Sequence, residues 1–374
     1  MKKFITLLLI LAMVLPMAAC GSESDEPAPA FKIGIITGTA VQSKEEYQAA
    51  QRLKEKYGNM IVAVTYPDNF TSETDKMVNM AVKLAEDPDV KAIIWVQAVE
   101  GSVEAMNRIR EKRDDLLLIG GITTETPAAV AQAFDVVMVT NELQLGADIV
   151  GQAAKQGAKT FVHISFDRHL EIEAVAQRRG KIEQRCNVLG MEYVDAFAPD
   201  PVGPKGVEEV KEWVEENIPV YVDLYGKDTA FFSTNCAMQA PLIRQVAKQG
   251  AIFPLECCPS PFHAYPDAFG IDLAGHENDS KYVLDEIKKN VEEYNNSGRM
   301  STWSVPMATM IIEGGAEYAI KWCKGEVTQR LDEDALLSEL RKIGGGEVSW
   351  SSYEDSTAGV LKNYKMIEAP LYDF

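Results

Sequence analysis

The chain has 374 residues, enough for two domains of ordinary size, and carries a formal net charge of -19 at pH 7. An acidic surface of this kind repels phosphate backbones and anionic lipid headgroups, so we expect no nucleic-acid partner and no electrostatic adhesion to a membrane. The six cysteines include no CxxC pair, which excludes a dense disulfide framework.

The first 20 residues have the pattern of a secretory leader. Lys2 and Lys3 precede an apolar run that is shorter than the about 20 residues of a transmembrane helix. The run ends in Ala18-Ala19-Cys20, which resembles the cleavage site of bacterial lipoproteins. We therefore expect a lipoprotein signal peptide at 1–20, acylation of Cys20, a lipid-anchored location outside the cytoplasm, and a linker at 21–30, which is small, acidic and Pro-containing. The alternative is a soluble leader in which Cys20 is incidental.

Continuous apolar runs alternate with helical patterns after the linker. Runs that are apolar throughout are typical of strands buried on both faces, and helix-length separations between them imply parallel βαβ units. The sequence therefore predicts an α/β fold of two doubly wound parallel-sheet domains with a cleft between them. The predicted strands are 31–36, 60–66, 92–96, 116–119, 136–139, 160–166, 193–197, 230–233 and 252–258.

The order of these elements resembles the type I periplasmic binding proteins over nearly everything after the linker. Residues 230–235 resemble the strand-to-loop stretch in which sugar-binding members carry an Asn that contacts the ligand; the next residue is often Asp there and is Cys236 here. Residues 300–307 resemble the segment that returns to the first domain. The chain also resembles a family of uncharacterised bacterial lipoproteins. The resemblance implies an N-terminal lobe of 31–141 plus 303–325 and a C-terminal lobe of 142–302 plus 326–374.

Ligands of open parallel sheets bind beyond the carboxyl ends of the strands, and two lobes close over them by a hinge. The resemblance implies that Arg168 donates hydrogen bonds to ligand oxygens, although the same cluster would also suit a helix start capped by Asp167. Trp303 would stack on a ligand ring or pack in the hinge. The candidate ligand-binding residues are Thr37, Thr39, Gln97, Thr123, Asn141, Phe166, Asp167, Arg168, Asn235, Cys257, Trp303 and Ser304.

Three local patterns carry structural interpretations. Cys257 and Cys258, with His263 nearby, raise the question of a metal site, but neighbouring residues of a strand point to opposite faces, so we expect no metal and buried cysteines. Ser43 and Glu46 predict a capping box at a helix start. Gly314-Gly315 is interpreted as allowing close helix packing.

Signatures of enzymes are absent from the sequence: it has no Walker A run, no G-x-S-x-G and no H-E-x-x-H. We expect no enzyme and no cofactor. The main hypothesis is a membrane-anchored lipoprotein that captures a small polar solute and delivers it to an ABC permease. The alternative is a lipid-anchored sensor that signals to a membrane receptor, and a distant one is an extracytoplasmic hydrolase. Polyols, nucleosides and small acids suit the candidate residues equally.

Overall fold

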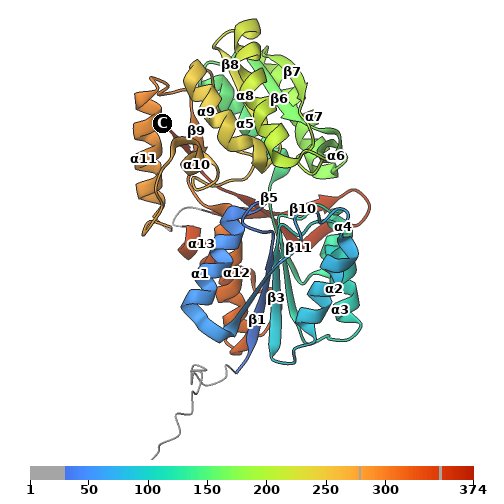
Figure 1. The fold of residues 1–374 in the computed structure, drawn as a ribbon. Coiled ribbons are helices and arrows are strands. Elements are labelled where there is room, and N and C mark those ends of the chain that lie inside the picture. The colour runs from blue at the N-terminus through green and yellow to red at the C-terminus, as the bar shows by residue number, and fades with distance from the viewer. Residues whose placement is uncertain (1–29, 278, 345–347) are drawn as a thin grey trace, which may run out of the picture.

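The computed structural model describes residues 30–277, 279–344 and 348–374, which form two α/β lobes placed end to end (Figure 1). The predicted leader, Cys20 and all but the last residue of the predicted linker lie outside these residues. Among the described helices, none combines the length and apolar character needed to cross a bilayer.

The N-terminal lobe is built on a seven-stranded sheet in the order β10-β11-β5-β4-β3-β1-β2. Every pairing from β2 to β11 is parallel, and only the β10–β11 pair is antiparallel. This agrees with the continuous apolar runs, since both faces of the sheet are covered. The strands are β1 (Lys32–Thr37), β2 (Ile61–Thr65), β3 (Val90–Val96), β4 (Leu117–Gly121), β5 (Val136–Thr140), β10 (Ser349–Asp355) and β11 (Gly359–Glu368).

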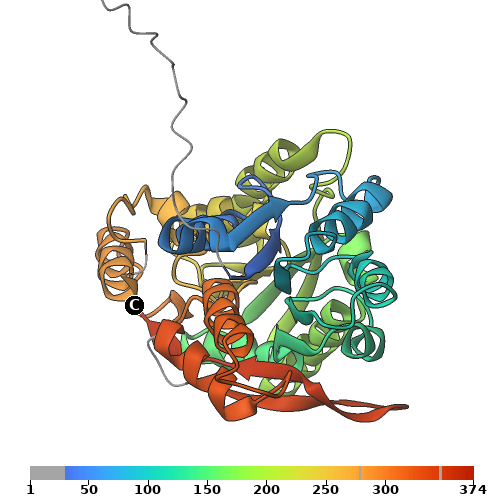
Figure 2. The ribbon, with the colours of Figure 1, turned by 90° about the horizontal axis from the view of Figure 1, so that it is seen from below.

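Helices cover both faces of this sheet, as the view from below shows (Figure 2). One face carries α1 (Lys44–Tyr57), which continues into a short 3₁₀ turn (Gly58–Met60), together with α12 (Met307–Cys323) and α13 (Glu333–Gly344). The other carries α2 (Thr74–Ala85), α3 (Ser102–Arg110) and α4 (Pro127–Ala133). A Cβ at Gly314 of α12 would lie 2.8 Å from Leu340 of α13, which confirms the packing interpretation for this glycine.

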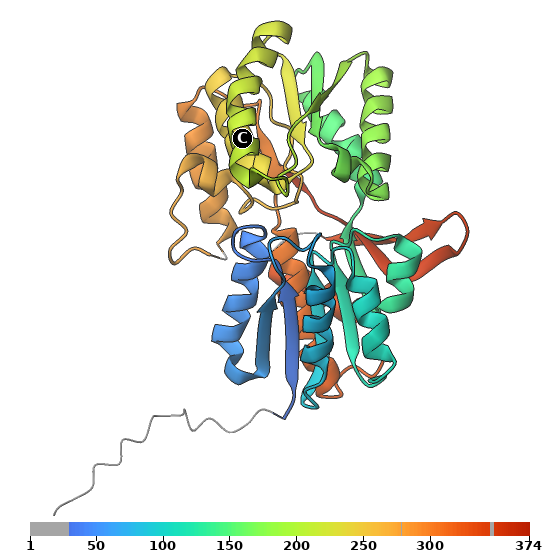
Figure 3. The same ribbon diagram turned by 45° about the vertical axis from the view of Figure 1, so that its right-hand side comes forward.

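The prediction that residues 326–374 belong to the C-terminal lobe is wrong for most of that segment. Helix α13 packs on α12 through Leu336 and Leu340, and β11 extends the N-terminal sheet beyond β5 as half of a protruding hairpin (Figure 3). Arg330 also binds the N-terminal lobe, donating to Asp135 at 2.8 Å. Without β11, β5 would be an edge strand with unpaired backbone groups, and α13 needs a partner on which to bury its apolar face. Of the described residues in this segment, only β12 (Leu371–Asp373) and Phe374 return to the C-terminal lobe.

The C-terminal lobe contains a three-stranded parallel sheet in the order β7-β6-β8, with helices on both faces. The predicted strand at 252–258 is wrong as a regular element: only Ile252 and Phe253 form isolated bridges, and Pro254 then removes a backbone donor. The elements are β6 (Thr160–Ser165), β7 (Glu192–Phe197), β8 (Thr229–Ser233), α5 (Glu142–Lys155), α6 (Asp167–Leu170), α7 (Glu173–Leu189), α8 (Gly206–Tyr225), α9 (Cys236–Gln249), α10 (Tyr265–Phe269) and α11 (Ser280–Glu293).

The chain passes between the lobes three times, after β5, after β9 (Ser301–Trp303) and after β11. The passages are bonded to one another: Asn141 N donates to Ile367 O at 3.1 Å, and Ser304 donates to Pro370 O from its N and its Oγ at 2.9 and 3.0 Å. Trp303 is buried beside them. Three of the candidate ligand residues, Asn141, Trp303 and Ser304, therefore lie in the segments that join the lobes, where a hinge would bend.

Candidate functional site

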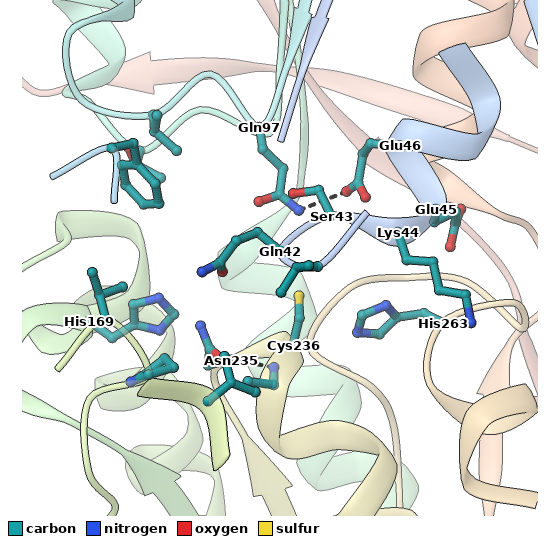
Figure 4. A pocket seen from close by; sticks show the side chains of 18 of the residues that line it. Gln42, Ser43, Lys44, Glu45, Glu46, Gln97, His169, Asn235, Cys236 and His263 are labelled. Carbon is teal, nitrogen blue, oxygen red and sulfur yellow. Dashed lines mark hydrogen bonds between the residues drawn. The ribbon is translucent and has the colours of Figure 1, made fainter. Parts of the chain in front are cut away.

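A cleft of about 930 Å³ lies between the two lobes. Its walls are made by loops and helix starts that follow the strands of both sheets, which is where open α/β folds place their ligands. The N-terminal lobe contributes the start of α1 and the end of β3, and the C-terminal lobe contributes the segments after β6 and β8 (Figure 4). The side chains labelled in that view include Gln42, Glu45, Glu46, Gln97, His169, Asn235, Cys236 and His263.

Glu46 and Gln97 form the central polar pair of the N-terminal wall. Gln97 Nε2 donates a 2.8 Å hydrogen bond to Glu46 Oε1, and Glu46 is only 4% exposed. Burial raises the pKa of Glu46 above its ordinary value. Gln97 has φ = 54°, a left-handed conformation that costs energy for a side chain of this size and is often found at functional sites. The predicted capping box is wrong, because the Ser43 side chain makes no cap hydrogen bond and the Glu46 carboxylate is directed to Gln97.

Glu45 stands beside this pair and adds a second carboxyl group to the wall. Its Oε1 accepts hydrogen bonds from Thr309 N at 3.3 Å and Thr309 Oγ1 at 3.1 Å. Burial raises the pKa of Glu45, and the neighbouring Glu46 charge raises it further. Two adjacent carboxyl groups at the start of α1 thus present hydrogen-bond acceptors to the cleft.

The cluster after β6 is largely bonded to itself. Arg168 donates from Nε and Nη2 to both carboxylate oxygens of Asp200, at 2.7 and 2.8 Å. His169 stacks on Phe166 with ring centroids 4.4 Å apart, and its Nδ1 lies 3.2 Å from Thr234 Oγ1. Burial, helped by the Arg168 charge, lowers the pKa of His169 to about 3, so this imidazole is neutral at pH 7.

The segment after β8 places the thiol of a cysteine in the lining of the cleft. Asn235 Oδ1 caps α9 by accepting from Ala237 N at 2.9 Å, and Cys236 opens that helix. Cys236 Sγ lies 3.3 Å from Cys258 Sγ and 3.9 Å from Cys257 Sγ. The expectation that Cys257 and Cys258 point to opposite faces is wrong, because this segment is irregular and both sulfurs approach Cys236.

Three of the twelve candidates, Gln97, Arg168 and Asn235, line the cleft. Phe166 and Asp167 line a smaller hollow of about 410 Å³ that adjoins Arg168 and Asp200.

Three threonines among the candidates do not line the cleft and form hydrogen bonds with other residues of the chain. Thr37 is buried and donates to Gly38 O at 2.9 Å, Thr39 donates to Asp68, and the Thr123 hydroxyl lies 3.3 Å from Tyr364 Oη. Sequence reasoning missed Glu45 and Glu46, which lie in the first turn of α1 and line the cleft. The sequence pattern predicts Glu46 as a capping residue instead.

The lining of the cleft is strongly acidic. It contains eight carboxylate side chains and three lysine or arginine side chains. Each of those cations is already paired: Lys44 with Asp267 at 2.6 Å, Arg168 with Asp200 at 2.7 Å, and Lys211 with Glu208 at 2.7 Å. The cleft therefore offers many acceptors and little unpaired positive charge to a ligand. The eight are Glu45, Glu46, Glu100, Glu125, Glu171, Glu173, Glu208 and Asp267.

Comparison with known proteins places the chain among uncharacterised relatives. Residues 31–301 match the family described as "Protein of unknown function (DUF3798)". An uncharacterized protein of Treponema pallidum (strain Nichols) is 32% identical over 208 residues, which are 56% of this chain and 94% of that protein.

Solved structures share the two-lobed architecture. A proposed transcriptional regulator from Clostridium difficile 630 superposes with a TM-score of 0.75 at 23% identity, covering 93% of this chain and 100% of that one. An ABC transporter solute-binding protein from Burkholderia graminis C4D1M, in complex with D-arabinose, superposes with a TM-score of 0.51 at 13% identity, covering 81% and 92%. At these identities the likeness concerns the fold, which is that of the type I periplasmic binding proteins.

Proposed function

The chain belongs to the DUF3798 family of proteins of unknown function, and from this premise we propose that it is an extracytoplasmic solute-binding protein that captures a small polar molecule between its lobes. The observation that carries the proposal is the cleft of about 930 Å³ at which the carboxyl ends of both parallel sheets meet. A volume of this size suits a small molecule rather than a macromolecule. The net charge of -19 opposes binding to DNA.

The charge of the cleft narrows the class of solute. Carboxylates and amides accept hydrogen bonds from hydroxyl and amine groups, whereas a free anion would meet repulsion without an unpaired cation to offset it. We therefore favour a neutral polyhydroxyl compound, such as a sugar, sugar alcohol or nucleoside, or a small cation over a carboxylic acid. Glu46, Gln97 and Asn235 are the contacts we propose. The D-arabinose complex of the Burkholderia protein supports the polyhydroxyl class.

The mechanism is closure without chemistry. The three bonded passages between the lobes would act as a hinge, and closure would bury the solute between Glu46 on one side and Asn235 on the other. The exposed Lys44–Asp267 pair at 2.6 Å already joins α1 to α10 across the cleft. His169 is neutral at pH 7 and packed on Phe166, a state suited to lining a pocket.

A lipid anchor at Cys20 would keep this receptor beside a membrane partner and raise its effective concentration there. We propose an ABC permease as that partner, since the Burkholderia protein of the same fold is described as a solute-binding component of an ABC transporter. The leader pattern Ala18-Ala19-Cys20 supports the anchor.

A thermal-shift panel tests the proposal. The panel contains D-arabinose, D-ribose, allitol, adenosine and putrescine, with citrate and L-glutamate as the anionic arm. A compound that binds only the folded protein at 100 times its Kd adds about 2.7 kcal/mol of stability. We expect a saturable rise in melting temperature with at least one neutral or cationic compound and none with the anions. Stabilisation by the anions alone, or turnover of any panel compound, would contradict the proposal.

A further inference from the structure

Four side chains of types that can ligate a metal converge beside the cleft, all from the C-terminal lobe. Their ligand atoms lie within 4.8 Å of one another. One comes from the first turn of α9 and the other three from the irregular segment between α9 and α10, so the cluster joins the start of α9 to the segment that follows its end. The four are Cys236, Cys257, Cys258 and His263.

The distances suit tetrahedral coordination. A zinc ion about 2.3 Å from each sulfur requires sulfur–sulfur edges of about 3.8 Å. The three sulfur pairs are separated by 3.3 Å for Cys236–Cys258, 3.7 Å for Cys257–Cys258 and 3.9 Å for Cys236–Cys257. Cys257 Sγ lies 3.9 Å from His263 Nε2. These separations exceed the about 2.05 Å of a disulfide by a wide margin, and all three thiols are free.

The surroundings favour a bound cation. Glu46 interacts electrostatically with Cys236 and Cys258, and Glu45 does so with His263. A carboxylate beside a ligating histidine is a common outer-shell arrangement in zinc sites.

We propose that this cluster is a binding site for one zinc ion, with three thiolates and one imidazole as ligands: Cys236, Cys257, Cys258 and His263. Four protein ligands complete a tetrahedral shell, which is typical of a resident structural ion rather than a catalytic one. The ion would fix the segment 257–263 against α9 and so shape the C-terminal wall of the cleft. Cys236 and His263 line the cleft, which gives the ion a path of entry. The proposal goes beyond solute capture and does not depend on which solute binds.

Binding of cobalt and zinc to the purified, reduced protein tests the site. We expect one equivalent of Co²⁺ to give the intense visible absorption of tetrahedral thiolate coordination, one equivalent of Zn²⁺ to displace it, and elemental analysis to find one zinc per chain after gel filtration. Each thiol releases its proton on binding, so affinity should rise with pH. Loss of outer-shell partners alone typically weakens metal binding by about 10–100-fold, so Cys236→Ser should weaken it by at least about 100-fold.

The matched control is Cys323→Ser, which removes a part-buried thiol at the end of α12, outside the cluster. It should bind cobalt as the wild type does. If Cys236→Ser does not fold, His263→Gln provides a second test, because replacing nitrogen by oxygen should shift the cobalt spectrum. The proposal would be overturned by a protein that binds no cobalt when reduced, by a spectrum that is unchanged in Cys236→Ser and His263→Gln, or by a Cys236–Cys258 disulfide found by thiol titration in place of metal.

Discussion

Gln97 donates a 2.8 Å hydrogen bond to Glu46 and thereby joins the end of β3 to the first turn of α1. Gln97 has a left-handed backbone with φ = 54°, and Glu46 is almost fully buried. The fold thus holds a strained residue and a buried carboxyl group at the point where ligands of this architecture bind. The Gln97–Glu46 hydrogen bond thus holds the Glu46 carboxyl group in a fixed position in the wall of the cleft.

The first prediction concerns Arg168. Because Asp200 occupies both Nε and Nη2, we expect Arg168→Ala to lower the free energy of unfolding by about 1 kcal/mol, the scale of a partly exposed ion pair. Binding of the stabilising panel compound should weaken less than about 3-fold, well below the loss of a direct charged hydrogen bond. Denaturant titration and calorimetry measure the two effects, and Asp200→Ala is the matched control. A tenfold loss of binding with unchanged stability would show that the guanidinium contacts the solute.

The second prediction concerns pH and Glu256. This side chain is fully buried beside the lobe-joining strand β9, accepts a 2.6 Å hydrogen bond from Thr302 Oγ1, and has no partner for Oε2. Burial raises the pKa of Glu256 well above its ordinary value. The folded state therefore keeps a proton that the unfolded state loses above about pH 4.3, so Glu256 reduces stability as pH rises.

We expect Glu256→Gln to match the wild type near pH 4 and to be more stable at pH 8 by on the order of 1 kcal/mol. Denaturation curves from pH 4 to pH 9 provide the measurement. The exposed variant Glu55→Gln serves as the matched control for replacing a glutamate by glutamine. Parallel slopes for the wild type and Glu256→Gln would refute the assignment of a raised pKa.

The third prediction uses the two neighbouring glycines of α12. At Gly314 a methyl group would lie 2.8 Å from Leu340 Cδ2 and 3.2 Å from its Cα, so Gly314→Ala must displace α13 and should cost about 1–3 kcal/mol. At Gly315 the nearest atoms are 3.8 Å away, so Gly315→Ala should be neutral or stabilise by up to about 1 kcal/mol through helix propensity. Melting temperatures of the two variants decide this, and equal effects at both positions would contradict the packing described.

The sequence was sufficient to predict the two-lobed α/β fold because strands buried on both faces leave continuous apolar runs. It was insufficient for residues 326–368, because the local sequence of α13 and β11 does not show whether these elements pack on the N-terminal or the C-terminal sheet. The candidate site could be predicted from the sequence only in part. Gln97 and Asn235 follow strands directly, whereas Glu46 had an equally good local role as a capping residue. Cys236 and Cys258 meet because the segment that contains Cys258 is irregular. Such a segment has no hydrophobic periodicity, so its course could not be predicted from the sequence.

The central claim is that an acidic interlobe cleft captures a polar solute through Glu46. Calorimetric titration of wild type, Glu46→Gln and the exposed control Glu55→Gln with the panel compound that gives the largest thermal shift tests it most directly. We expect the wild type and Glu55→Gln to bind equally and Glu46→Gln to bind at least tenfold more weakly, since a hydrogen bond to a charged group contributes about 1.5–3 kcal/mol and a tenfold change corresponds to about 1.4 kcal/mol. Undiminished binding by a folded Glu46→Gln variant would contradict the account.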